Sequence, residues 1–214
     1  MSTSPTPSGK SDRVGQRRAS ALARMERTHP LLMLVYLALV GITVLFAILV
    51  VAYVQARHFH PLPDRPFPRF FALSTVLLVL SSATLRPTTR AYRKDNLRRL
   101  ARSLGYTLAL GLAFVAAQLV GWRELLLGGL APRGVATGSY IYLLSALHAV
   151  HLLAGIGFLA YFWLLTRHAA ADGVRTLVFI RNPYRRLQLR MLRLYWHFMD
   201  GLWLALFLVL LFTV

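Results

Sequence analysis

The stretch from Gly138 to Thr166 limits the possible folds of this chain more than any other. It is long enough to cross a bilayer, which takes ~20 mostly apolar residues, and it contains no formally charged residue. At ~100° per residue, His148, His151 and Gly155 fall on one narrow arc of a helix. The arc is extended by Ser145 and Gly138, and the opposite side carries Leu143, Leu147, Val150 and Ala154. We expect the polar arc to face protein, where small residues allow close helix approach and imidazoles find partners.

The composition indicates an integral membrane protein. Apolar residues make up 57% of its 214 residues, and the charges are concentrated between long apolar runs. This pattern predicts an all-α integral membrane protein, since no alternating strands of ~10 residues occur. The absence of cysteine excludes disulfides, thiolate metal sites and thiol nucleophiles within the chain. The formal charge of +18 does not indicate nucleic acid, because the arginines cluster at helix ends, where anionic lipid headgroups favour them.

Five apolar runs predict five transmembrane helices within one domain, residues 29–214. The approximate spans are residues 30–56, 69–94, 97–127, 138–166 and 192–214. Residues 1–28 are rich in Ser, Pro and basic residues and predict a disordered basic cytoplasmic tail. The first run is too long for the apolar region of a cleavable signal peptide.

The connections between the spans carry further predictions. We expect the second span to continue as a helix past Arg86, and Asp95-Asn96 to form a turn that caps the third span. The segment 128–138 is expected to be a flexible loop. Residues 167–193 are interpreted as a basic connection interrupted at Asn182-Pro183.

The distribution of Lys and Arg predicts the orientation. Of 25 such residues, twenty lie in the N-terminal tail and in the connections Arg86–Arg102 and Arg167–Arg193, and five lie on the other side. Because cytoplasmic loops carry an excess of Lys and Arg, the N-terminus is expected in the cytoplasm and the C-terminus outside.

No catalytic constellation can be assembled from this sequence. The chain has seven acidic residues, and only Asp200 lies clearly within a predicted span. Paired carboxylates, a nucleophile beside a base and a glycine-rich phosphate loop are all missing from the sequence. We therefore predict no catalytic, cofactor-binding or metal-binding residue in this chain.

Histidines inside membrane helices suggest either haem ligation or helix cross-bonding. His148 and His151 share a helix, so they cannot both bind one iron axially. His197 is predicted about 6–9 Å inside the cytoplasmic end of its span, against about 26 Å for His148 and 21 Å for His151. We therefore favour interhelical hydrogen bonds, two of which would contribute ~1–3 kcal/mol. The residues predicted to pack or hydrogen-bond between helices are Ser145, His148, His151, Gly155, Gln118 and Thr107.

A second polar patch lies at the start of the fifth span. His197 and Asp200 are three residues apart on one helical face, and their pairing would lower the cost of an aspartate at that depth. Tyr195 and Trp196 are interpreted as part of an interfacial aromatic belt, with a phospholipid headgroup site as the sharper hypothesis. The candidate interfacial or headgroup residues are Arg193, Tyr195, Trp196, His197 and Asp200.

Four motifs resemble one family. Leu194 to Phe207 (LYWHFMDGLWLALF) resembles the last-helix signature of subunit III of haem-copper oxidases, the cytochrome c oxidase group. Tyr142 to Gly155 is similar to that family's helix with paired histidines, and Phe70 to Leu85 matches in its Ser-Thr and Ser-Ser pairs. The fourth motif is the spacing of Thr107, Gly111, Phe114, Gln118 and Trp122. The motifs follow the family's order over spans two to five, and five spans correspond to its short form.

The resemblance implies a non-catalytic subunit of a respiratory oxidase in a bacterial inner membrane. It implies direct packing beside the catalytic subunit I, association with subunit II, and haem and copper held by those partners. It also implies bound phospholipid in a cleft between helices, and a supporting role in proton uptake and in preserving the active site. The family usually has a glutamate near the position of Ile42, but no carboxylate occurs from Pro30 to Ala56. A proton-linked role of that glutamate is therefore not carried over to this chain.

Several alternatives remain open on the sequence. Within the family, the chain also fits a subunit III homologue of a quinol oxidase or of a nitric-oxide-reductase-associated complex. An alternative of another class is a haem b membrane anchor. A small transporter is disfavoured, because broken helices and a charge pair near the midplane are not evident in the sequence.

Overall fold

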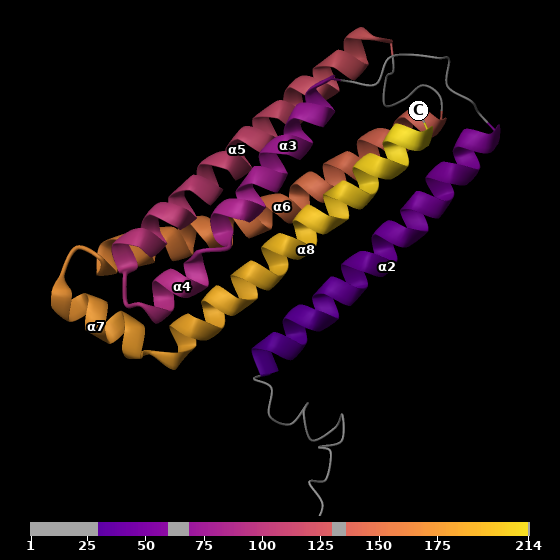
Figure 1. The fold of residues 1–214 in the computed structure, drawn as a ribbon. Coiled ribbons are helices and arrows are strands. Elements are labelled where there is room, and N and C mark those ends of the chain that lie inside the picture. The colour runs from indigo at the N-terminus through magenta and orange to yellow at the C-terminus, as the bar shows by residue number, and fades with distance from the viewer. Residues whose placement is uncertain (1–29, 60–68, 130–135, 214) are drawn as a thin grey trace, which may run out of the picture.

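The computed structural model describes residues 30–59, 69–129 and 136–213, and it places seven α-helices in them. In chain order these are α2 (Pro30–Phe59), α3 (Arg69–Leu85), α4 (Thr88–Arg93), α5 (Leu97–Leu127), α6 (Ala136–Ala169), α7 (Gly173–Arg181) and α8 (Pro183–Thr213). The long helices run side by side, and α7 lies at the end of the bundle where α6 ends and α8 begins (Figure 1). The predicted tail, the connection at 60–68 and most of the loop at 128–138 lie outside the described residues.

Five helical stretches of the described chain are long and apolar enough to cross a membrane. They are Pro30–Phe59, Phe70–Arg93, Leu97–Leu127, Thr137–Ala169 and Pro183–Thr213. The all-α membrane class and the predicted number of spans are therefore confirmed. The bounds predicted for the third span agree with α5, whereas α2 and α6 run a few residues further than predicted.

The second span continues past Arg86 to Arg93, as predicted, but it has a break of two residues between α3 and α4 that was not predicted. α3 ends at Leu85 and α4 begins at Thr88, because Pro87 has no backbone N–H to continue the helical hydrogen bonds. Side-chain hydroxyls bind the carbonyl oxygens at the break. Ser103 Oγ donates to Thr84 O, and Thr88 Oγ1 donates to Leu85 O at 2.6 Å.

The predicted turn before α5 is confirmed. Asp95 adopts a positive φ of 53°, and Asn96 is the N-cap residue of α5. The side-chain Oδ1 of Asn96 accepts a hydrogen bond from Arg99 N at 2.9 Å, which satisfies one free N–H at the start of the helix.

The predicted basic connection at 167–193 is wrong in its second half. α7 fills residues 173–181, and α8 begins at Pro183 rather than at 192. Asn182 Oδ1 accepts from Tyr184 N at 3.0 Å, and Pro183 occupies the first helical position, where its missing N–H costs nothing. Asn-Pro therefore starts a helix here, and the basic residues that follow it lie on the first turns of α8.

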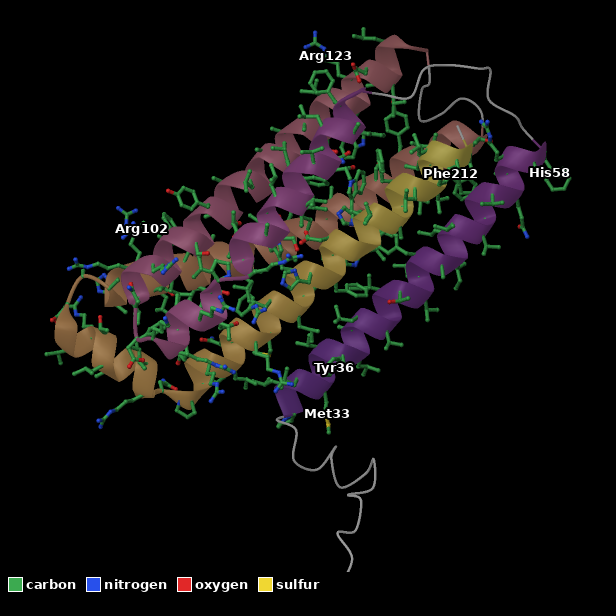
Figure 2. The ribbon with its side chains drawn as sticks, viewed as in Figure 1. Met33, Tyr36, His58, Arg102, Arg123 and Phe212 are labelled. Carbon is green, nitrogen blue, oxygen red and sulfur yellow. The ribbon has the colours of Figure 1, made fainter. Side chains whose placement is uncertain are left out.

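The core lies between α3, α5, α6 and α8, and α2 packs on α6 and α8. α2 buries one residue in each seven, namely Leu32, Leu39, Phe46 and Tyr53, and most of its remaining surface is exposed. This narrow contact is what a helix at the edge of a membrane bundle needs, because lipid covers the rest. Arg102 and Arg123 point away from the bundle near opposite ends of α5 (Figure 2).

Candidate functional site

The hydroxyl side chains of α3 connect that helix to α5 and α8. We call them the hydroxyl row, and they are Ser74, Thr75, Ser81, Ser82 and Thr84. Three N–H groups of the neighbouring helices donate to the row: Gln118 Nε2 to Ser74 Oγ (3.0 Å), Trp203 Nε1 to Thr75 Oγ1 (3.1 Å) and Trp196 Nε1 to Ser81 Oγ (3.2 Å). Two further hydrogen bonds join Ser82 Oγ to His197 Nδ1 and Thr84 Oγ1 to Thr107 Oγ1, each at 2.8 Å. Such bonds hold helices together where water is absent.

Each hydroxyl can make two bonds, which suits this row to a helix interface. Ser74 Oγ and Thr75 Oγ1 both donate to Phe71 O, at 2.9 and 2.8 Å, and Ser81 Oγ donates to Leu78 O at 2.8 Å. The hydroxyl proton therefore goes to the helix's own backbone, and the oxygen lone pairs accept from the neighbouring helix. The tryptophan and glutamine N–H groups that donate to them are buried and satisfied.

Trp196 packs between the helices of the bundle. Its side chain is fully buried, and a Cβ added at Gly111 would lie 3.0 Å from the indole. Its indole Nε1 donates to Ser81 Oγ of α3, and Gly155 of α6 also lies close to the ring.

Tyr195 also contacts a neighbouring helix, and it is partly buried. Its hydroxyl donates to His151 O of α6 at 2.7 Å. A Cβ added at Gly155 would lie 2.9 Å from the ring of Tyr195, so the glycine is what allows this approach. Tyr195 and Gly155 therefore form one packing contact between α6 and α8.

The arc of small and polar residues on α6 faces protein. Ser145, His148 and Gly155 are buried, while Leu143 and Val150 on the other side are 47% and 62% exposed. Ser145 accepts a hydrogen bond from Trp122 Nε1 of α5 at 3.0 Å. Thr107, Gly111, Phe114 and Gln118 are buried along one face of α5.

The hydrogen bonds expected from the two imidazoles are not those of the structure. His148 is enclosed by three aromatic rings, at centroid distances of 6.5 Å to Phe46, 6.0 Å to Phe114 and 5.0 Å to Trp203. Neither of its ring nitrogens has a hydrogen-bond partner among the residues that the structure describes. The His151 Nδ1 lies 2.7 Å from Leu147 O of its own helix. Within the described chain, α2, α5 and α8 present aromatic rings to His148, so the predicted interhelical hydrogen bond of this imidazole is not formed there.

His197 lies about 21 Å along α8 from Pro183 at ~1.5 Å per residue, because the helix begins nine residues before the predicted span. The predicted pair is loose, with 4.0 Å between His197 Nδ1 and Asp200 Oδ2, because His197 Nδ1 bonds Ser82 instead. The carboxylate oxygens of Asp200 are buried beside Ser82 and His197.

A cavity of about 1020 Å³ opens between α2, α4 and α8. Tyr36 and Leu39 line it from α2, and Thr89, Tyr92 and Arg93 line it from α4. Tyr36 lies near the N-terminal end of α2 (Figure 2). We call this cavity the arginine groove. Of the five candidate headgroup residues, the groove includes Arg193 and His197, whereas Tyr195, Trp196 and Asp200 do not line it.

The sequence reasoning did not identify three of the groove arginines as site residues, namely Arg93, Arg186 and Arg190. Arg186, Arg190, Arg193 and His197 follow the spacing i, i+4, i+7 and i+11, which places them on one face of a helix. The spacing was readable in the sequence, but it gained a meaning only once α8 was known to begin at Pro183. Arg93 completes the set from α4.

The described residues hold no group of three or more His, Asp or Glu side chains placed to bind a metal ion. Within the same part of the chain, the buried polar groups are mostly engaged in helix-to-helix hydrogen bonds. The arrangement can therefore join helices and, in the arginine groove, contact an anion.

Comparisons with known proteins point to one family. The family model "Cytochrome c oxidase subunit III" matches residues 65–213. The chain is 31% identical over 169 residues to "Probable cytochrome c oxidase subunit 3" of Mycobacterium tuberculosis, which covers 78% of each chain. It is 30% identical over 170 residues to the protein of the same name in Nocardia farcinica, which covers 79% of each chain.

A more distant relative carries a different name. "Cytochrome bo(3) ubiquinol oxidase subunit 3" of Buchnera aphidicola is 29% identical over 135 residues, 63% of this chain and 64% of that one. The family match covers α3 to α8, which includes the hydroxyl row, the histidine arc and the α8 side of the arginine groove. On this evidence the chain belongs to the cytochrome c oxidase subunit III family and is a membrane subunit of a haem-copper oxidase.

Proposed function

We propose that this chain is the non-catalytic subunit III of a proton-pumping, cytochrome c-type terminal oxidase in a bacterial inner membrane. It contacts the catalytic subunit I directly and associates with subunit II, and those partners hold the haem and copper. The observation that carries the proposal is the family match over residues 65–213 together with relatives named as cytochrome c oxidase subunit 3.

The geometry supports a role in stability rather than in chemistry. The hydroxyl row and Trp196 join α3, α5, α6 and α8 into one body, which suits a subunit that supports its catalytic neighbour. We infer that the chain supports proton uptake by subunit I, preserves the active site during turnover and binds phospholipid. Ile42 stands where the family usually has a glutamate, so none of these roles is routed through that position.

We infer an N-terminus in the cytoplasm and a C-terminus outside from the distribution of the basic residues. A reporter that is active only outside the cytoplasm is expected to work when fused after Val214. Activity of the same reporter after Lys94 instead would show that the orientation is inverted.

A quinol oxidase is the second candidate, and the Buchnera aphidicola relative is the observation that favours it. The residues of this chain do not identify the electron donor, so the donor has to be identified on the complex. Tagged chain purified from its native membrane is expected to bring down subunits I and II, and the complex is expected to oxidise reduced cytochrome c. Oxidation of ubiquinol but not of cytochrome c would favour the alternative. Purification without any haem-copper subunit would contradict both.

A further inference from the structure

Asp200 is a buried carboxyl group without a role in the function proposed above. Its side chain is 11% exposed, and neither carboxylate oxygen has a hydrogen-bond partner in the described chain. The His197 Nδ1 lies 4.0 Å from Asp200 Oδ2, which is too far for a hydrogen bond. An ionised carboxylate that is buried without a partner is costly, and binding a proton removes the charge.

The charged groups around this pair leave the carboxyl group uncompensated. Arg193 of α8 and Arg86, which follows α3, act electrostatically on His197, while Ser82 is the neighbouring group that acts on Asp200. In the part of the chain that the structure describes, no arginine or lysine forms an ion pair with Asp200. A proton is therefore the ligand that this carboxylate needs.

Ser82 differs from the rest of the hydroxyl row in where its proton goes. The other four hydroxyls of the row donate to carbonyl oxygens of α3 itself. Ser82 forms no such bond within the described residues, and its Oγ lies 2.8 Å from His197 Nδ1. When His197 Nδ1 donates to Ser82 Oγ, the serine proton is free to point at the carboxylate of Asp200 beside it.

His197 connects these groups to the arginine groove. Its side chain is 35% exposed and lines the groove, whose volume is about 1020 Å³. A polar cavity of this size holds water. A proton taken from that water by His197 Nε2 lets Nδ1 give its own proton to Ser82 Oγ, and the Ser82 hydroxyl gives one to the carboxylate. One proton enters and one reaches Asp200, so the imidazole and the serine both end neutral, and release follows the same steps in reverse.

The polar path ends at Asp200. From Gly201 to Phe212, α8 carries no ionisable side chain. The hydroxyls nearer the start of α3 have their protons on backbone carbonyls. Proton conduction through a membrane needs a continuing series of groups that can exchange protons, so this arrangement stores a proton rather than conducting it.

We propose that Asp200 is a proton-binding site, which takes up and releases one proton through Ser82 and His197 from the arginine groove. This goes beyond the function proposed above, because it places a proton on a residue of this chain and not in subunit I.

The test follows the carboxyl group of Asp200 by infrared spectroscopy of the intact complex in bilayers. A protonated carboxylic acid has a carbonyl band that differs from those of a carboxylate and of an amide. The spectrum of the wild type minus that of Asp200→Asn is expected to show this acid band, which should shift in D2O and disappear as the pH rises. Asp95→Asn, at an exposed position in the turn before α5, is the control and should leave the band unchanged.

The rate of the band shift after transfer into D2O tests the route. Ser82→Ala removes the hydroxyl between imidazole and carboxyl, and Ser74→Ala, whose hydroxyl proton lies on a backbone carbonyl, is the matched control. A positioned group in a proton transfer contributes ~10²–10⁴-fold to its rate. We expect Ser82→Ala to exchange about 100-fold more slowly than the wild type, and Ser74→Ala to exchange at the wild-type rate.

Three outcomes would overturn the inference. An acid band missing from the difference spectrum would show that Asp200 stays ionised, and a band that neither titrates nor shifts in D2O would show a carboxyl closed to the groove. Equal exchange in Ser82→Ala and Ser74→Ala would contradict the route. If Asp200→Asn does not assemble, Asp200→Glu keeps the acid and is expected to move its band. Subunits I and II are identified in each sample, so a missing band in an intact oxidase would contradict this inference and leave the proposed function standing.

Discussion

The hydroxyl row of α3 and the histidine arc of α6 are both polar stripes on apolar helices, but they are held in different ways. In the row, Ser74 and Ser81 each accept a hydrogen bond from a neighbouring helix. In the arc, His148 lies among aromatic rings without a hydrogen-bond partner in the described chain. Both stripes face protein, so burial alone does not tell the two apart.

The difference follows from side-chain chemistry. A hydroxyl can donate to its own helix and still accept from another helix, so it fits almost any interface that offers an N–H group. An imidazole needs a polar group at a set direction and depth, and at His148 the neighbours are Phe46, Phe114 and Trp203. A polar stripe in a membrane helix therefore predicts that the face is buried, but not which interaction holds it there.

Replacing Trp196 by Ala should have the largest effect, because this residue belongs to both regions. Its indole bonds Ser81 of the row and lies against Gly111, and Gly155 of the arc is a further neighbour. Truncating a buried tryptophan costs about 3–5 kcal/mol, so we expect the subunit to dissociate from the complex at much lower detergent or temperature. Tyr106→Ala, on the exposed side of α5, is the control. Equal retention of the two variants would show that Trp196 is not central to the bundle.

Replacing Gln118 by Leu tests the row alone. The bond from Gln118 Nε2 to Ser74 Oγ measures 3.0 Å, and interhelical bonds in membranes contribute ~0.6 and up to roughly 1.7 kcal/mol. A cycle with Ser74→Ala, Gln118→Leu and the double variant should give a coupling energy in that range when unfolding is measured in detergent. A coupling of zero would mean that this part of the row is held by packing, as His148 is in the arc.

Replacing His148 by Leu should have the smallest effect on stability, and it tests the difference between the arc and the hydroxyl row. No described hydrogen bond is lost, and an unpaired polar group leaves the core, so the change in stability should stay below about 1 kcal/mol. This is a smaller effect than the one expected from the sequence, which assumed interhelical bonds. Ser81→Ala, which removes the acceptor for Trp196, is the comparison variant. A greater loss with His148→Leu than with Ser81→Ala would show that the imidazole has a polar partner in the complex.

Much of the fold was predictable, because long apolar runs determine membrane helices directly. Asn96 also predicted the start of α5, because its side chain can cap a helix. The start of α8 was missed because three arginines follow Pro183 within the first turns, and a hydropathy pattern assigns such a stretch to a loop. Because the start of the helix at Pro183 was not predicted, Arg186 and Arg190 were not recognised as sharing a helical face with Arg193 and His197.

The candidate site was less predictable than the fold. The sequence indicated that His148 is buried, but its aromatic neighbours come from α2, α5 and α8, and one sequence cannot reveal contacts between distant segments. The sequence analysis identified the Ser-Thr and Ser-Ser pairs of this row as a family motif, and hydroxyls in membrane helices can bond either their own backbone or a neighbouring helix. The structure shows that Ser74, Thr75 and Ser81 do both.

The central claim is that this chain supports a catalytic oxidase without taking part in its chemistry. The direct test compares the oxidase with and without the chain at matched haem content, recording the initial rate and the total turnovers before inactivation. We expect the initial rate to stay close to that of the intact complex, because in the function proposed above the haem and copper lie in the partner subunits. We expect the total turnovers to fall. An immediate collapse of the initial rate with the haem content intact would contradict the account.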